Sequence, residues 1–169
     1  MRAREALRRT RPLALAAGVA FCGGFAAIAA YLRVLERGEP INERTQALVA
    51  VFGGAGALAA LVAMALCAIL APRLGRGGLA AGSLVLAAPG FVGALALCFS
   101  IQLNAGEIAA FFDHPDAHGV RYLAYRTFVA AAYIVVFGPS YLWPWPAPTI
   151  VAAIAGAAFL HGRRFSSER

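Results

Sequence analysis

An uninterrupted apolar run from Ala47 to Ala71 dominates the pattern of polar and hydrophobic positions along the chain. These 25 residues include no charged, hydroxyl or amide side chain. As an α-helix they would be about 38 Å long, compared with about 30 Å for the hydrocarbon core of a bilayer. A water-soluble helix of this length would need a polar face, and this run has none. The run therefore predicts a membrane-spanning helix, in which all backbone polar groups pair within the segment.

Four other apolar segments accompany this run. Residues 13–32 and 79–103 are each long enough for one membrane crossing. The uncharged stretch 127–160 would be about 51 Å long as one helix, which is too long for one crossing and short for two. A Gly-Pro pair and a turn rich in tryptophan and proline divide it. We therefore predict a span over 122–142 and a short last helix over 147–161, whose depth in the membrane stays open.

Composition supports the same fold class. The chain has 169 residues, of which 61% are hydrophobic and only 14% charged, and this balance is too apolar for a soluble domain of that size. We predict an all-α integral membrane protein in which residues 1–169 form a single small bundle of four or five transmembrane helices. The three cysteines lie inside apolar runs, where we expect them to pack as small apolar residues.

The distribution of arginine predicts a cytoplasmic N-terminus. Five arginines lie within residues 1–12 and two in the short turn 72–78, whereas the connections 33–46 and 107–126 carry three and two. A fifth full crossing would place the three arginines after residue 160 outside, giving seven inside against eight outside. Four crossings with a re-entrant or surface-lying last segment give ten against five. The positive-inside rule favours the second arrangement, whereas the aromatic, proline-rich turn favours five helices.

The basic residues also indicate the partners. The net charge is +7, and the arginines flank the apolar runs, so we expect the N-terminal cluster to contact anionic lipid headgroups. A nucleic-acid partner is excluded, because no basic face carries interleaved aromatic residues. We expect a multi-pass protein of a bacterial cytoplasmic (inner) membrane.

Small residues recur at intervals of four along the first two predicted helices. The positions are Ala16, Ala20 and Gly24 in the first, and the pairs Gly53/Ala57 and Gly56/Ala60 in the second. Such spacing lets two helix backbones approach closely in lipid. It predicts tight packing within the bundle, with other membrane proteins or with a second copy of the chain.

A proline and a short polar face mark the third predicted span. Pro89 and Gly90 lie near its middle, where we expect a kink that either packs or marks a substrate site. Ser100, Gln102 and Asn104 lie near its end. They are candidates for lining a cavity, or they mark the point where the helix leaves the membrane.

One cluster contains side chains typical of metal ligands. Asp113, His114, Asp116 and His118 follow each other closely, and on a helix the two histidines would share a face that Glu107 could reach. Such a group could bind a divalent metal or handle a proton. The same sequence is also typical of a helix start, with Asp113 as the N-cap and Asp116 in the first turn. We favour the helix start.

The uncharged stretches argue against chemistry inside the membrane. Residues 13–32, 47–71, 77–106 and 127–160 contain no acidic, basic or histidine side chain, although such residues usually mark proton relays and ion pathways. His161 follows the last apolar run and is expected at the membrane interface. We therefore predict no cofactor, apart from the divalent metal considered for the 113–118 loop.

Three functions follow from these patterns. The first is a small non-catalytic integral membrane subunit or accessory protein that acts by helix packing with partner proteins. The second is a small transporter or channel for an uncharged or apolar solute, which would use the proline kink and the polar face. The third is an enzyme or metal site at the membrane surface in the loop 107–121. The absence of ionisable groups from the apolar stretches favours the first and argues against an enzyme.

Overall fold

The structure, a computed structural model, describes residues 12–113, 117–142 and 144–166, including all side chains except those of residues 107, 110–113, 117, 118, 137–142 and 164–166. The described chain consists of helices joined by short connections, which confirms the all-α prediction. The helices are α2 (Pro12–Glu36), α3 (Glu43–Leu70), the short 3-10 helix η1 (Ala71–Arg73), α4 (Arg76–Asp113), α5 (Ala117–Leu142) and α6 (Pro146–Ser166).

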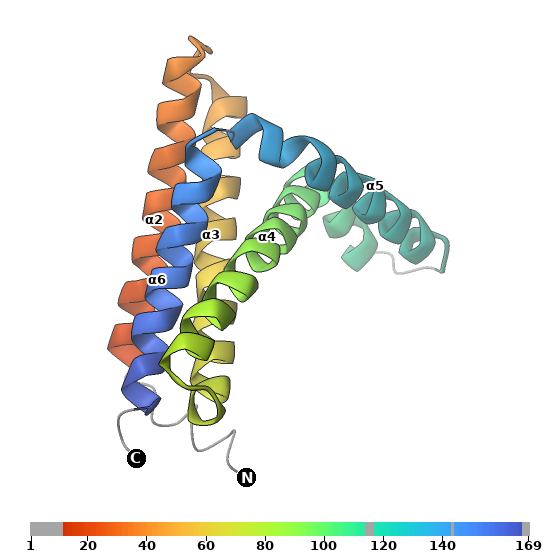
Figure 1. Cartoon of the computed structure of the whole chain (residues 1–169). Coiled ribbons are helices and arrows are strands. Elements are labelled where there is room, and N and C mark those ends of the chain that lie inside the picture. The colour runs from red at the N-terminus through yellow and green to blue at the C-terminus, as the bar shows by residue number, and fades with distance from the viewer. Residues whose placement is uncertain (1–11, 114–116, 143, 167–169) are drawn as a thin grey trace.

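Helices α2, α3, α4 and α6 pack side by side, and α3 contacts each of the other three (Figure 1). α2 and the first half of α4 run in one direction, and α3 and α6 run in the other. We call one end of this bundle the base, where α2 begins, residues 71–76 connect α3 to α4, and α6 ends. The opposite end, called the top, holds residues 36–43 and the start of α6. The described chain therefore enters and leaves the bundle at the base.

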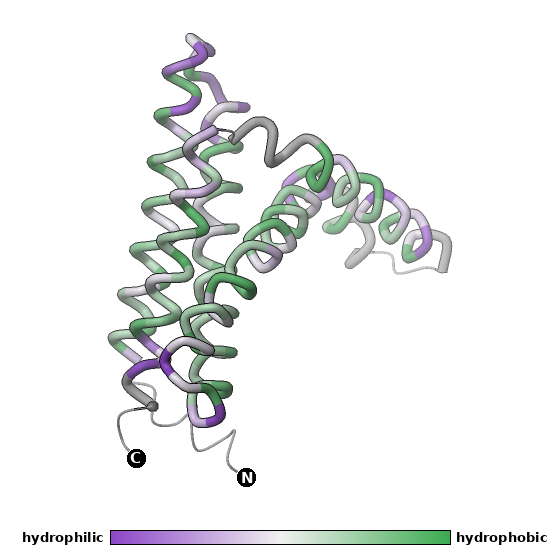
Figure 2. Tube along the Cα trace, in the orientation of Figure 1, coloured by the Kyte–Doolittle hydropathy of each residue, from purple (hydrophilic) through white to green (hydrophobic). Residues whose placement is uncertain are grey.

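Three of the described helices are long and apolar enough to cross a membrane. They are α2, α3 continued through η1 (Glu43–Arg73), and α4 as far as Gly106. Figure 2 shows hydrophobic positions along the length of these helices and hydrophilic positions where they meet the base and the top. This arrangement is that of a multi-pass membrane protein.

A polar cap starts α3 at the top of the bundle. Gly38 has a φ of +65°, the left-handed conformation that glycine adopts readily, and it ends the turn after α2. The side chain of Asn42 accepts a hydrogen bond from the backbone N–H of Thr45 at 3.1 Å. The Thr45 hydroxyl in turn donates to the carbonyl of Pro40 at 2.8 Å. The first bond satisfies one of the free N–H groups of the helix start, and the second ties the Thr45 side chain to the preceding connection.

Glycines bring α2 and α3 into close contact. A Cβ atom at Gly56 would lie 2.6 Å from the Cβ of Ala26 and 2.8 Å from the carbonyl oxygen of Cys22. A Cβ atom at Gly53 would lie 3.2 Å from the Cβ of Ala27. The close approach predicted from the small residues of α3 is therefore confirmed. Backbone contact of this kind supplies the dispersion energy that holds helices together in lipid.

The face of α2 that makes this contact differs from the one predicted. Ala16, Ala20 and Gly24 are exposed, and a Cβ atom at Gly24 would meet nothing within 4 Å. The contact is made on the other side of the helix, by the turn around Gly23 and Ala26. Both faces of α2 carry small apolar residues, so spacing alone does not distinguish the packed face from the exposed face.

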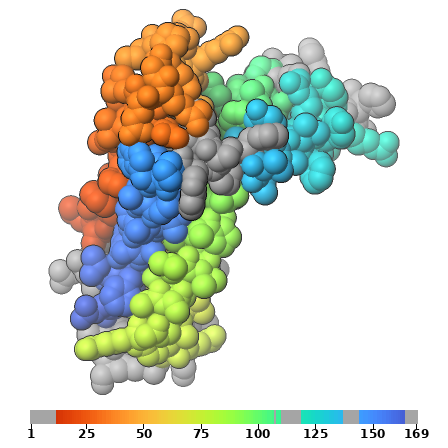
Figure 3. Space-filling model, turned by 45° about the horizontal axis from the view of Figure 1, so that its top comes forward, coloured from red at the N-terminus to blue at the C-terminus, as the bar shows by residue number. Residues whose placement is uncertain are grey.

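α4 continues well beyond the predicted span of 79–103. It is 38 residues long, includes Pro89 within its length, and ends at Asp113. Its second half leaves the bundle and lies beside α5 (Figure 1). We call residues 97–113 and 117–142 the arm. Figure 3 shows the arm standing out from one side of the bundle.

α6 returns along the bundle from the top to the base. It is 21 residues long and so extends beyond the short last helix expected over 147–161. Pro146 lies at its first turn, where the missing N–H group costs nothing. Ile150, Ile154 and Ala158 are buried at intervals of four and form its packed face.

Candidate functional site

The polar face predicted at the end of the third span is divided between two sides of α4. Ser100 and Asn104 are buried, whereas Gln102 is exposed. The Ser100 hydroxyl donates to the carbonyl oxygen of Thr127 on α5 at 3.4 Å. The side-chain amide of Asn104 donates to the carbonyl oxygen of Ser100 at 2.9 Å. Ser100 and Asn104 thus make backbone hydrogen bonds where α4 meets α5, and Gln102 lies away from them.

Pro89 and Gly90 lie on the outside of α4. Pro89 is exposed, and a Cβ atom at Gly90 would meet nothing within 4 Å. Neither residue lines either of the two cavities described below. The structure therefore does not bring the proline together with the polar face.

The predicted metal cluster lies outside the described side chains. His114 and Asp116 belong to the connection between α4 and α5, which is not among the described residues, and the same holds for the side chains of Glu107, Asp113 and His118. Within the part of the chain that the structure describes, no group of three or more His, Cys, Asp or Glu residues is placed to hold a metal ion.

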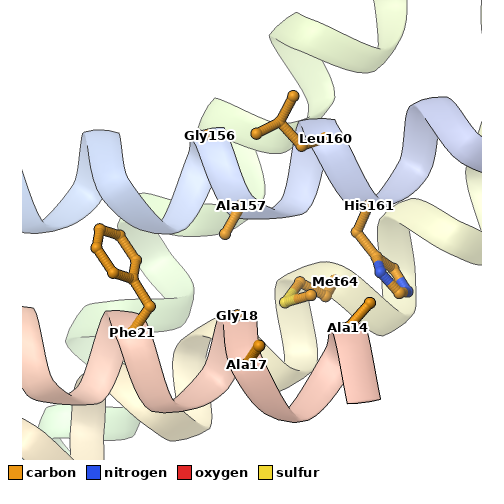
Figure 4. Close-up of a pocket in the computed structure, with 9 residues that line it drawn as sticks. All are labelled: Ala14, Ala17, Gly18, Phe21, Met64, Gly156, Ala157, Leu160 and His161. Carbon is orange, nitrogen blue, oxygen red and sulfur yellow. The ribbon is translucent and has the colours of Figure 1, made fainter. Parts of the chain in front are cut away.

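A groove of about 450 Å³ lies between α2 and α6, with α3 at its floor (Figure 4). We call it the α2–α6 groove. Its lining residues are Ala14, Ala17, Gly18, Phe21, Met64, Gly156, Ala157, Leu160 and His161. Alanine and glycine supply three of the four lining residues on α2 and two of the four on α6, and these small residues leave space between the helices. No charged side chain lines it.

Glycines set the depth of the groove. A Cβ atom at Gly18 would lie 2.7 Å from the Cε of Met64, so the methionine side chain packs directly against the α2 backbone. A Cβ atom at Gly156, on the opposite wall, would meet nothing within 4 Å. The floor is therefore closely packed, and the α6 wall is open.

His161 lies at the end of the groove nearest the base and is only 4% exposed. Its imidazole points from α6 toward Ala14 of α2 and Met64 of α3 (Figure 4). The interfacial depth predicted for this histidine stays a prediction, because burial between helices does not give the depth of a residue in the membrane. The next residue, Gly162, fits tightly against α4, since a Cβ atom there would lie 3.0 Å from the Cδ1 of Leu79. This close approach draws the last turns of α6 into the bundle.

A cation follows the groove on the same face of α6. Gly156, Leu160 and Arg163 are separated by four and three residues, which aligns them along one side of the helix. Arg163 is exposed, and its guanidinium lies 5.7 Å from the centre of the Phe159 ring. Arg163 does not line the groove, but it adds a positive charge one turn beyond Leu160 toward the base.

A second hollow of about 280 Å³ lies between α2 and α3 near the top. It is lined by Ala27, Tyr31, Ile41, Thr45, Gln46, Val49, Ala50 and Gly53. The Thr45 hydroxyl in its wall already donates to Pro40. This hollow is shallow and apolar, and it presents no group of reactive side chains.

Comparison with known protein families, with curated proteins and with solved structures finds no match to this chain.

Proposed function

We propose that this protein is a small non-catalytic integral membrane subunit that acts by packing the arm against the helices of a partner membrane protein. The observation that carries this proposal is the apolar surface of the arm. Its exposed large hydrophobic residues are Leu97, Ile101, Leu103, Val120, Tyr122, Tyr125, Phe128, Val129, Tyr133, Val135 and Val136. Phe128 is 72% exposed. These side chains come from both helices of the arm.

The arm lacks the packing that stabilises the bundle. Its two helices contact each other, while α5 barely touches α6 and has no other substantial contact in the described part of the chain. Helices owe most of their stability in proteins to tertiary packing, which two helices alone supply poorly. A third helix from a partner would complete a small bundle around the arm. The Ser100 bond to α5 holds the two arm helices in place for that contact.

Four of the five polar side chains that are buried in the described part of the chain, all except His161, support a role without catalysis. The Ser83 hydroxyl donates to the carbonyl oxygen of Ala80 at 2.8 Å, and those of Thr45 and Ser100 donate to other carbonyls. Asn104 does the same through its amide. These groups are engaged with the backbone, as expected for polar residues that serve packing in an apolar environment.

Charge supports a topology of four crossings by α2, α3, α4 and α6, with α5 at the opposite membrane surface. α6 is not among the three helices that are apolar enough to cross by composition, and its place in this topology rests on its packing against α2, α3 and α4. The segments that lead into, connect or leave the bundle at the base contain ten arginines and two acidic residues. The segments at the top and in the arm contain five arginines and six acidic residues. By the positive-inside rule the base, and with it the N-terminus, faces the cytoplasm of a cytoplasmic membrane. The arginine count is the same ten against five that the sequence predicts for four crossings, but here the helix that does not cross is α5 and not the last helix.

The length of α4 supports the same placement. At 38 residues it is about 57 Å long, nearly twice the thickness of the hydrocarbon core. Its second half therefore extends beyond a membrane that its first half spans. Tyr122, Tyr125 and Tyr133 on α5 are of the type that collects at membrane interfaces.

Copurification with an arm variant tests this function. The full-length protein is purified in mild detergent beside Tyr125→Ala/Phe128→Ala, which removes two exposed arm rings. Leu84→Ala/Val85→Ala is the matched control, because these side chains are equally exposed on the first half of α4. We expect a membrane protein at one-to-one stoichiometry with the wild type and the control, and its loss from the arm variant. Purification of the chain alone, or a partner that survives the arm substitutions, would contradict the proposal.

A further inference from the structure

The α2–α6 groove has the form and chemistry of a site for a hydrocarbon chain. Among the side chains of its nine lining residues, the imidazole of His161 is the one polar group. A buried water molecule needs two to four polar partners, which the walls between Ala14 and Phe21 do not offer. In a membrane a groove that opens between two helices toward lipid is filled by the apolar material around it. Flexible acyl chains fit such an irregular, apolar hollow.

The end of the groove near the base favours an anionic headgroup. Arg163 stands one turn beyond Leu160 on the same side of α6, and its exposed guanidinium lies 5.7 Å from the centre of the Phe159 ring. Guanidinium groups bind phosphate through a pair of parallel hydrogen bonds.

We propose that the α2–α6 groove binds one anionic phospholipid, with an acyl chain between α2 and α6 and the phosphate at Arg163. The lipid then acts as a structural ligand that fills the space left by alanine and glycine. His161 forms the wall at the turn where the chain meets the headgroup. The proposal uses the membrane orientation given above and is independent of the docking role of the arm.

Gly156 provides a variant that fills the groove without disturbing the fold. A Cβ atom at this position would meet no neighbouring atom within 4 Å, and Gly156 lines the groove, so the side chain of Gly156→Leu has room to extend into the hollow. Gly93 is also an exposed helical glycine with nothing within 4 Å, but it lies on α4 away from the groove. Gly93→Leu therefore matches the change in helix propensity and in exposed apolar surface. A difference between the two variants reports on the groove alone.

The test is native mass spectrometry of the full-length protein in mild detergent, with added phosphatidylglycerol or with phosphatidylcholine of the same acyl chains. We expect one phosphatidylglycerol to bind the wild type and Gly93→Leu equally, and Gly156→Leu to bind it roughly tenfold more weakly. Arg163→Gln should lower the preference for phosphatidylglycerol by about fivefold, the effect of one arginine near an anionic lipid. Arg76→Gln, at the base but outside the groove lining, should leave that preference unchanged.

Equal lipid binding by Gly156→Leu and Gly93→Leu would overturn the proposal, as would equal affinity for the two lipids in the wild type. Inorganic phosphate should not displace the lipid, since the acyl chain supplies much of the binding. Displacement at millimolar phosphate would reduce the site to an anion site at Arg163 and contradict the role of the groove. A change of oligomeric state in Gly156→Leu without a change in lipid binding would identify the groove as a helix-packing face instead.

Discussion

The indole Nε1 of Trp145 donates a hydrogen bond to the carboxylate of Glu36, at 3.1 Å to Oε1 and 3.3 Å to Oε2. The bond joins the end of α2 to the start of α6, across 109 positions of the sequence. Arg33 holds the same carboxylate with an ion pair of 3.0 Å. This hydrogen bond therefore links the two walls of the α2–α6 groove directly at the top. Toward the base each wall packs against another helix, α2 through Gly18 and Met64 and α6 through Gly162 and Leu79.

A double-mutant cycle separates the free energy of this hydrogen bond from that of the neighbouring contacts. Trp145→Phe keeps the ring and removes the donor, and Glu36→Gln removes the charge. We expect a coupling free energy of about 1 kcal/mol between the two sites, since the bond is charge-assisted but lies where solvent reaches it. The free energy of unfolding by dodecyl sulfate titration is the measurement. Coupling near zero would show that the bond does not stabilise α6 against α2.

The backbone contact between α2 and α3 predicts that alanine substitutions of two helical glycines affect stability differently. Gly56→Ala would place a methyl group 2.6 Å from Ala26, and we expect it to lower the free energy of unfolding by about 1–3 kcal/mol through overpacking. The methyl group of Gly24→Ala meets open space, so the free energy of unfolding of this variant should be unchanged or higher by up to about 1 kcal/mol. Equal losses in the two variants would contradict the packing described here. The same detergent unfolding assay measures both.

We expect the buried polar residues near the end of the third predicted span to contribute to the stability of the protein. Ser100→Ala removes the bond to Thr127 and should cost about 0.6 kcal/mol, the average for a hydrogen bond between membrane helices. Gln102→Ala, on the exposed side of α4, should leave the stability unchanged. If these residues line a transport path, Gln102→Ala would instead alter the flux of an uncharged solute in proteoliposomes, and the stability difference would not appear.

Thiol labelling in whole cells tests the topology of four crossings. A membrane-impermeant maleimide should label Glu39→Cys, which lies in the connection at the top, and should not label Gly75→Cys at the base. Ser167→Cys, placed after α6, should behave as Gly75→Cys does. Labelling of Ser167→Cys from outside would indicate that α5 crosses the membrane as well. The three native cysteines lie within helices and define the background for the assay.

Much of the helical architecture could be predicted because lipid imposes a length on apolar runs. The runs 13–32 and 47–71 lie within α2 and within α3 continued by η1. The ends of helices beyond the apolar core were harder to place. α4 continues through polar residues to Asp113, and α6 continues past His161, because a helix outside the membrane core does not need hydrophobic side chains.

The packed faces could not be predicted for a related physical reason. In water the buried side of a helix is apolar and the exposed side is polar, so the sequence records the difference. In lipid both sides are apolar, and Gly23 and Gly24 look alike although one is packed and the other open. His161 is buried where α6 meets α2 and α3, beside Ala14 and Met64, which are far from it in the sequence. The groove was missed because its walls consist of alanine and glycine, which carry no chemical signal.

α2 begins and α6 ends at the same end of the bundle. Two copies joined tail to head in one polypeptide could therefore adopt a common orientation without an added crossing between them. Such a covalent pair would allow one copy to carry a groove or arm substitution while the other stays intact. It would reveal whether a single intact groove or arm suffices for the binding that each is proposed to make.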